Sequence, residues 1–132
     1  MLELSFCQKN SESILFIDTE QYLLDNIYSL FPINYKVHTT QTLDAAWKIL
    51  RTNKIDCIFC NVNLASGQNG VEFLKICKAN GINIPFVLVS GDSNSKKVDF
   101  IKQYGVTDVL MKPLNQHRIT KKIKSYLASP AI

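Results

Sequence analysis

Short runs of strand character alternate five times with longer stretches of helical periodicity, and this alternation constrains the fold more than any other feature of the sequence. Most of the strand-like runs are apolar throughout, which is typical of strands buried on both faces of a sheet. The second run is more polar and suits an edge strand. The five runs lie at residues 14–17, 36–39, 57–60, 86–89 and 109–111.

Each stretch that follows a strand-like run carries a single apolar stripe at helical spacing on a polar background. The stripes lie within residues 23–31, 43–50, 71–77, 98–101 and 119–127. Thr42 precedes the second stripe and is a good N-cap, whereas Gly81 and Gly105 stand where the third and fourth helices should end. The sequence therefore predicts an α/β fold, with a doubly wound, five-stranded parallel sheet covered by helices on both faces.

The length and composition suit a single domain, because 132 residues with 46% apolar and 20% charged side chains can build one ordinary core. We assign residues 13–128 to this domain, with an N-terminal extension at 1–12 and a C-terminal tail at 129–132. The apolar runs fall far short of the ~20 residues that cross a bilayer. The first ten residues lack a basic stretch before an apolar one, so we expect a cytoplasmic protein without a membrane partner.

Cys57 and Cys60 formally match the spacing of a redox or zinc dithiol. Their segment reads as a buried strand, however, and residues three apart on a strand point to opposite faces and lie about 10 Å apart. That separation exceeds the ~7 Å limit for a disulfide bridge. We therefore expect both to be reduced thiols that act as small apolar side chains.

Candidate functional residues follow directly from the predicted topology, because open parallel sheets bind ligands at the carboxyl ends of their strands. Segments 14–20, 56–64, 69–72, 87–91 and 105–113 carry polar or turn residues at or near these ends. The residues to inspect are Asp18, Thr19, Glu20, Asn61, Ser90 and Lys112.

Taken in order over about residues 13–128, these five segments resemble the motifs of response-regulator receiver domains from two-component and phosphorelay signalling. The resemblance implies a flavodoxin-like (βα)5 fold, similar to that of chemotaxis regulators, with strand order 2-1-3-4-5. Asp18 matches the first acid of the family's acidic turn, and Thr19 replaces the second. Asn61 stands at the position of the phosphorylated aspartate. Ser90 and Lys112 keep the hydroxyl and the cation that contact the phosphoryl group in active members.

These departures determine which chemistry we expect of the site. In an active receiver a carboxylate attacks phosphorus, while Mg²⁺ held by acids neutralises the developing charge. The carboxamide of Asn61 is a poor nucleophile, and Asn61 with Thr19 removes two of three negative charges that would hold the metal. We therefore predict no catalytic residue and no required cofactor, with Mg²⁺ held weakly at best by Asp18, with or without help from Glu20.

Simpler structural roles are open for the same residues. Asp18 and Thr19 could cap the first helix, and Ser90 could bond only to the loop that follows it. Lys112 could form a structural ion pair with Asp18, which would lock the site. Val109 stands where the family often has a Tyr or Phe that changes rotamer on activation, so the usual coupling to the outer surface is doubtful as well.

Three functions are compatible with these residues. The first is a non-enzymatic pseudo-receiver that binds signalling proteins, such as an acidic protein or a component of a histidine-kinase pathway, without aspartate phosphorylation. The second is a phosphorylatable receiver in which Asn61 is an engineered replacement for the acceptor or deamidates to one, although Thr19 argues against it. The third and least favoured is a nucleic-acid-binding module.

The charge distribution points to the contact surface. The chain has a net charge of +4, but residues 91–132 hold eight Lys and Arg against three Asp and Glu. Lysine-rich helix faces are often merely solvated, yet this excess falls on the fourth helix, fifth strand and fifth helix, the face that active receivers use for output. The predicted contact charges are Lys96, Lys97, Lys102, Lys121 and Lys122.

Overall fold

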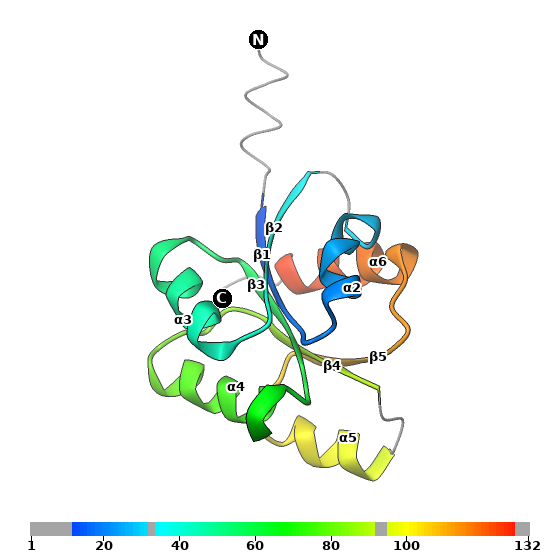
Figure 1. The fold of residues 1–132 in the computed structure, drawn as a ribbon. Coiled ribbons are helices and arrows are strands. Elements are labelled where there is room, and N and C mark those ends of the chain that lie inside the picture. Colours follow the sequence, from blue (N-terminus) through cyan, green and yellow to red (C-terminus); the bar gives the residue numbers. More distant parts are fainter. Residues whose placement is uncertain (1–11, 32–33, 92–94, 129–132) are drawn as a thin grey trace.

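Parallel strands form the centre of the molecule in a computed structural model that describes residues 12–31, 34–91 and 95–128. Within these residues, five strands build one sheet in the order β2-β1-β3-β4-β5 (Figure 1). The predicted fold and strand order are therefore confirmed. The strands are β1 (Glu12–Ile17), β2 (Tyr35–Thr40), β3 (Cys57–Asn61), β4 (Phe86–Ser90) and β5 (Asp108–Met111).

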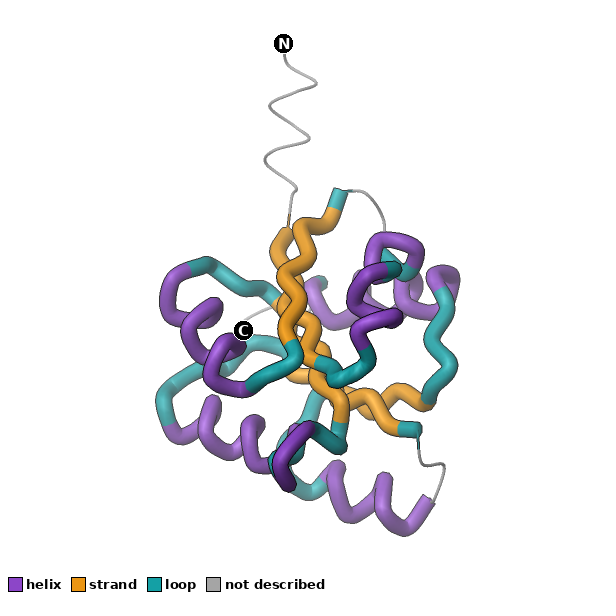
Figure 2. The backbone as a smooth tube through the Cα atoms, in the orientation of Figure 1, coloured by secondary structure: helices purple, strands orange, loops and turns teal. Residues whose placement is uncertain are grey.

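The helices form a layer on each face of this sheet (Figure 2). On one face, buried residues of α2 (Gln21–Asp25), the short 3-10 helix η1 (Ile27–Ser29) and α6 (Gln116–Leu127) share a cluster with the strands. On the other face, the core is completed by α3 (Leu43–Thr52), α4 (Gly70–Ala79) and α5 (Ser95–Lys102). Thr42 caps α3 as predicted, since its side-chain oxygen accepts a hydrogen bond from the Ala45 backbone N–H.

The two neighbouring cysteines of β3 confirm the reading of that segment as a strand buried on both faces. Cys57 belongs to the cluster under α6, whereas Cys60 belongs to the cluster under α4. Both are free and fully buried, and burial raises the pKa of each thiol well above its usual value. Both therefore pack as small apolar residues of the core.

The first predicted helix differs most from expectation, because one apolar stripe spans two short elements. The break falls at Asn26, whose side-chain Nδ2 donates to the Tyr22 carbonyl and whose backbone has left the helical region at φ −108° and ψ 19°. Asparagine competes for backbone hydrogen bonds in this way and disfavours helix interiors. Ile27 and Phe31 remain buried beyond the break, so the predicted stripe still packs on the sheet.

The structure describes little of the predicted N-terminal extension and none of the predicted C-terminal tail. Residues 1–11 of the predicted extension and residues 129–132 of the tail lie outside the described residues. Glu12, which we placed in the extension, is instead the first residue of β1 and pairs with Tyr35. In the part of the chain that the structure describes, no helix is long and apolar enough to span a membrane.

Candidate functional site

The predicted site residues meet at one edge of the sheet, where the parallel strands end. Asp18 directly follows β1, Asn61 and Ser90 are the last residues of β3 and β4, and Lys112 directly follows β5. Backbone hydrogen bonds continue past the strands at this edge. Asp18 donates to the Thr40 carbonyl at 3.1 Å, and Lys112 donates to the Ser90 carbonyl at 2.8 Å. The sheet register therefore fixes how the side chains are presented.

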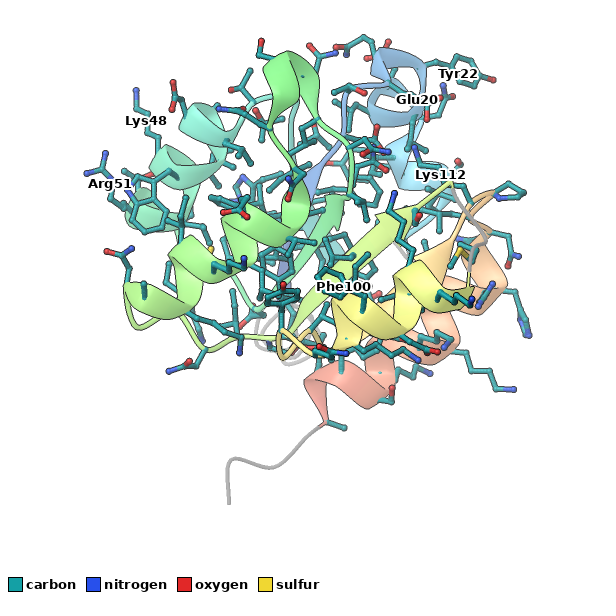
Figure 3. All side chains as sticks on the ribbon, turned by 90° about the horizontal axis from the view of Figure 1, so that it is seen from below. Glu20, Tyr22, Lys48, Arg51, Phe100 and Lys112 are labelled. Carbon is teal, nitrogen blue, oxygen red and sulfur yellow. The ribbon has the colours of Figure 1, made fainter. Side chains whose placement is uncertain are left out.

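Lys112 is held by two carboxylates from the other side of the site. Its Nζ lies 2.9 Å from Asp18 Oδ2 and 2.6 Å from Glu20 Oε1. Figure 3, which views this edge from below, shows Glu20 and Lys112 close together, whereas Lys48 and Arg51 project from α3 on the far side. The structure thus brings together three of the predicted residues, Asp18, Glu20 and Lys112, and adopts the ion pair considered for Lys112.

Asp18 is fully buried, and its two oxygens are compensated in different ways. Oδ1 accepts a hydrogen bond from the Glu20 backbone N–H at 3.0 Å. Oδ2 is buried and receives no hydrogen bond of good geometry, although the Lys112 ammonium lies 2.9 Å away. The positive charge of Lys112 is therefore the main interaction that stabilises Oδ2, because a buried carboxylate without a partner would lower the stability of the fold.

The ammonium is correspondingly stabilised in its charged form. Burial acts to lower the pKa of Lys112, but its close polar contacts with Glu20 and Asp18 and their negative charges outweigh burial and raise that pKa above its usual value. The Glu20 side chain is 60% exposed, so its contact with Lys112 is screened by solvent and contributes little to stability. The buried contact with Asp18 is the one that matters for the fold.

Asn61 uses its carboxamide inside the loop that follows β3. Its Nδ2 donates to the Asn63 carbonyl oxygen at 2.6 Å. A carboxylate has no proton to donate, so an ionised aspartate at this position could not form the same bond and would place like partial charges in contact. The amide is therefore the better side chain for the observed loop conformation, a point that the sequence did not reveal.

This loop between β3 and α4 is closed by its own backbone hydrogen bonds. Leu64 donates to the Gln68 carbonyl, and Gly70 donates to the Val62 carbonyl at 2.8 Å. The turn needs positive φ at Ser66 and Gly67. Gly70 is required for another reason, because a Cβ there would lie 2.6 Å from Leu88 Cδ2 and 2.7 Å from the Asn61 carbonyl oxygen.

Thr19 and Ser90 lie at the same edge of the sheet, after β1 and at the end of β4. Thr19 lies beside the site, and its backbone carbonyl accepts a hydrogen bond from Gln41 Nε2 at 2.9 Å. Ser90 is buried at the end of β4. Capping of the first helix by Asp18 or Thr19 is wrong, because the N-cap residue of α2 is Glu20 and no side-chain cap bond forms there.

The donor set does not fit a tightly held Mg²⁺ ion. Among the described residues, no group of three or more His, Cys, Asp or Glu side chains is arranged to hold a metal. Asp18 is the only fully buried carboxylate in the described part of the chain, and a divalent cation at its Oδ2 would have to displace the Lys112 ammonium. Hard cations of this kind need several oxygen ligands.

The predicted contact lysines divide into two groups. Lys96, Lys97 and Lys102 on α5 and Lys121 on α6 are exposed. Lys122 differs, because its Nζ lies 3.1 Å from Asp108 Oδ2 and its side chain is only 36% exposed. Its charge is paired with Asp108 within the fold, and its role as a contact charge stays a prediction.

Asp108 links Lys122 to a second group on α6. The Tyr126 hydroxyl donates a hydrogen bond to the same Oδ2, and the Val109 backbone N–H donates to Oδ1. Burial would raise the pKa of Asp108, but these hydrogen bonds and the Lys122 charge lower it below its usual value. Burial and the Asp108 carboxylate raise the pKa of Tyr126. The cluster ties α6 to the start of β5.

Comparisons with known proteins agree with this arrangement of elements. The model of the response regulator receiver domain matches residues 14–124. Response regulator SaeR of Staphylococcus aureus is 25% identical over 115 residues, which is 86% of this chain and 50% of that protein. The chain therefore spans about half the length of the curated relatives it matches.

Solved structures extend the likeness of the fold at lower sequence identity. The receiver domain of the Francisella response regulator 1452 superimposes with a TM-score of 0.80 at 19% identity, covering 89% of this chain and 97% of that one. A CheY-like response regulator receiver domain protein from Methanospirillum hungatei JF-1 gives a TM-score of 0.79 at 20% identity, over 90% and 95% of the two chains.

Proposed function

Because this chain belongs to the response regulator receiver domain family, we propose that it is a receiver that works without aspartate phosphorylation, by binding another signalling protein. Receiver domains are the signalling domains of two-component systems, and they are generally not enzymes. We propose that the present chain is likewise not an enzyme and that it requires no cofactor. Its expected partner is an acidic signalling protein or a component of a histidine-kinase pathway, in the cytoplasm.

One observation carries the proposal, namely the amide at Asn61. This residue ends β3, where the family places its phosphoryl acceptor, and its Nδ2 donates to the Asn63 carbonyl. A carboxamide is a poor nucleophile toward phosphorus because it carries no formal charge. The hydrogen bond further suits an amide and not a carboxylate, which favours a loop adapted to asparagine.

The charges around Asn61 support the same proposal. In phosphoryl transfer, metal ions and cations neutralise the charge that develops on the transferred group. Here the Lys112 ammonium is already engaged by Asp18 and Glu20, and Thr19 supplies no second buried acid. Mg²⁺ binding at Asp18 is therefore proposed to be weak at best. Lys112 serves as the internal counter-ion of the buried aspartate.

The two alternative functions have less support. A phosphorylatable receiver with an altered acceptor would need Asn61 to be engineered or deamidated, and it leaves Thr19 unexplained. A nucleic-acid-binding module would use the basic C-terminal region, but Lys122 is engaged with Asp108 there. Oligomerisation is left open by both the sequence and the site.

The test is an intact-mass measurement after incubation with a small-molecule phosphodonor and Mg²⁺. We expect no gain of one phosphoryl group, which is about 80 Da, under conditions that label active receivers through their carboxylate. A labelled peptide that spans Asn61, with the side chain intact or deamidated, would overturn the proposal. Asp56 offers no substitute because it lies at the opposite end of β3, before Cys57.

Repaired variants provide the positive control for this measurement. Asn61→Asp alone should label slowly at most, because Thr19 still leaves the site short of a carboxylate. Asn61→Asp combined with Thr19→Asp should label markedly faster. Equal rates for the two variants would show that Thr19 does not limit the reaction.

A further inference from the structure

A groove between α4 and α5 carries one exposed aromatic ring on an otherwise largely buried apolar wall. It has a volume of about 310 Å³, and its walls include Val62, Val71 and Ile101 together with two aromatic rings. One of these, Phe100 on α5, is 55% exposed. Figure 3 labels Phe100 on α5, beside the neighbouring α4 ribbon. A phenylalanine has no polar group to gain from water, so its exposure marks a surface suited to contact.

The aromatic wall of the groove is held in place by its neighbours. The rings of Phe100 and Tyr104 pack edge to face with centroids 5.4 Å apart. The Lys75 ammonium lies 4.5 Å from the centroid of the Tyr104 ring, a cation–π geometry that steadies Tyr104 from the α4 side. A pre-organised aromatic anchor of this kind lowers the entropy cost of binding.

The charges at the groove indicate the chemistry of its occupant. Lys75, Lys97 and Glu72 line the groove, with Lys75 Nζ 3.4 Å from Glu72 Oε1, so these three side chains leave one net positive charge. The α5 helix itself carries three lysines against one aspartate. A basic surface disfavours a second copy of the same surface. One net positive charge in the lining disfavours a nucleic acid, because affinity for nucleic acid grows with the number of phosphates that lysine and arginine neutralise.

We infer that the groove between α4 and α5 docks an acidic, amphipathic helical segment of a partner protein, with an apolar side chain placed against Phe100. Helices bind such grooves through apolar side chains spaced at i, i+3 and i+4. The inference rests on the proposed function, because it names the surface and the partner chemistry for a receiver that acts by binding. It moves the centre of the contact from the face shared by α5, β5 and α6 to the opposite side of α5.

The probe for this site is a synthetic helical peptide of glutamates with leucines at i, i+3, i+4 and i+7, titrated into the ¹⁵N-labelled full chain. Amide shifts should cluster on α4 and α5. Phe100→Ala should weaken binding about tenfold, as expected for a central aromatic anchor. Lys97→Glu should weaken it several-fold, and more strongly at low salt than at high salt.

Matched controls distinguish specific binding at the groove from non-specific binding of the peptide. Tyr22→Ala removes an aromatic ring that is 82% exposed on α2 and should leave the affinity unchanged. A peptide with lysine in place of every glutamate should not bind. Because Phe100 is exposed, Phe100→Ala should keep the amide spectrum of the folded chain outside the groove.

Several results would overturn the inference: no saturable binding of the acidic peptide at millimolar concentration, shifts centred away from α4 and α5, equal affinity for Phe100→Ala, or tighter binding of a single-stranded oligonucleotide at the groove. The proposed function fails separately. Phosphoryl labelling of the wild-type chain would refute it while leaving the peptide data intact, since those are recorded without a phosphodonor.

Discussion

One lysine–aspartate pair lies at each end of β5. The two pairs differ in how many hydrogen bonds the aspartate carboxylate accepts. At the carboxyl edge of the sheet, Lys112 contacts Asp18. At the start of β5, Lys122 contacts Asp108. Both pairs place a lysine against a carboxylate that is at least partly buried, yet only the second is fully hydrogen-bonded.

The Asp108 carboxylate accepts hydrogen bonds from Tyr126, Lys122 and the Val109 backbone, and its side chain is 22% exposed. Asp18 is 0% exposed and accepts one well-formed bond, from the Glu20 backbone, while Oδ2 depends on an ammonium without good hydrogen-bond geometry. A satisfied network stabilises a fold, whereas an incompletely satisfied buried charge costs free energy and is typical of functional sites. The Asp108 cluster is therefore typical of a structural network, and the Asp18–Lys112 pair is typical of a functional site.

The largest expected effect comes from removing the cation beside Asp18. Lys112→Met leaves a buried carboxylate without its counter-ion and should lower the free energy of unfolding by about 3 kcal/mol. The pKa of Lys112 is raised in the folded chain, so its stabilisation is present below the usual lysine pKa of about 10.4 and is lost as the pH rises through the higher folded value. Urea denaturation should therefore give a constant deficit between about pH 6 and pH 9.

Asp18→Asn tests whether the charge itself causes that loss. In the Lys112→Met background it should recover much of the lost stability, because a buried amide costs less than a buried carboxylate. If the double variant is no more stable than Lys112→Met alone, packing of the lysine side chain, and not its charge, stabilises the site.

Tyr126→Phe should have the next largest effect. It removes one hydrogen bond to an ionised carboxylate and should cost about 2 kcal/mol at pH 7. The pKa of Asp108 is lowered in the fold, so the stabilisation is present above the usual aspartate pKa of about 3.9 and is lost as the pH falls through the folded value. The deficit, measured by urea denaturation, should shrink in acid; a deficit that is the same at pH 7 and pH 3 would show that the carboxylate is not involved.

Asn61→Asp should have a smaller effect, of about 1 kcal/mol at pH 7. The variant loses the hydrogen bond to the Asn63 carbonyl and brings a negative charge near it. Asn61→Ala is the matched control, because it loses the same bond without adding charge. Thermal unfolding should rank the wild type above both variants. Greater stability of Asn61→Asp than of the wild type would mean that Lys112 turns toward the new carboxylate and that the loop does not favour the amide.

The smallest effect is expected for Lys121→Glu, which changes an exposed lysine beside the engaged Lys122. Exposed substitutions usually shift stability by about ±0.5 kcal/mol, and this variant should stay within that range in urea denaturation. If Lys121→Glu proves as damaging as Tyr126→Phe, the cluster around Asp108 includes more of α6 than its hydrogen bonds indicate.

The sequence predicts the sheet, and the position of the candidate residues at its carboxyl edge, for a physical reason. Runs such as Cys57–Asn61 are buried on both faces, so their apolar character is strong, and parallel topology brings the strand ends together without further information. The short first helix was harder to predict, because the break at Asn26 depends on its side-chain bond to Tyr22 and not on periodicity.

Individual side-chain contacts could not be predicted, because they depend on helix rotation and loop conformation. The spacing of residues along the sequence does not encode either of these. Lys121 and Lys122 are neighbours in the sequence, and only the structure shows that Lys122 faces Asp108. The bond from Asn61 to Asn63 depends on the closed conformation of the loop. Phe100 belongs to an amphipathic helix, and its exposure follows from how α5 is rotated against α4.

The effect of Mg²⁺ on thermal stability shows whether Lys112 supplies the positive charge that a metal would otherwise bring to Asp18. At equal ionic strength, 10 mM Mg²⁺ should therefore raise the Tm of the wild type by less than about 2 °C, as expected for a dissociation constant no tighter than about 10 mM. Lys112→Met, with Asp18 uncompensated, should gain more. A wild-type increase of about 5 °C or more, equal to or above that of Lys112→Met, would contradict the account.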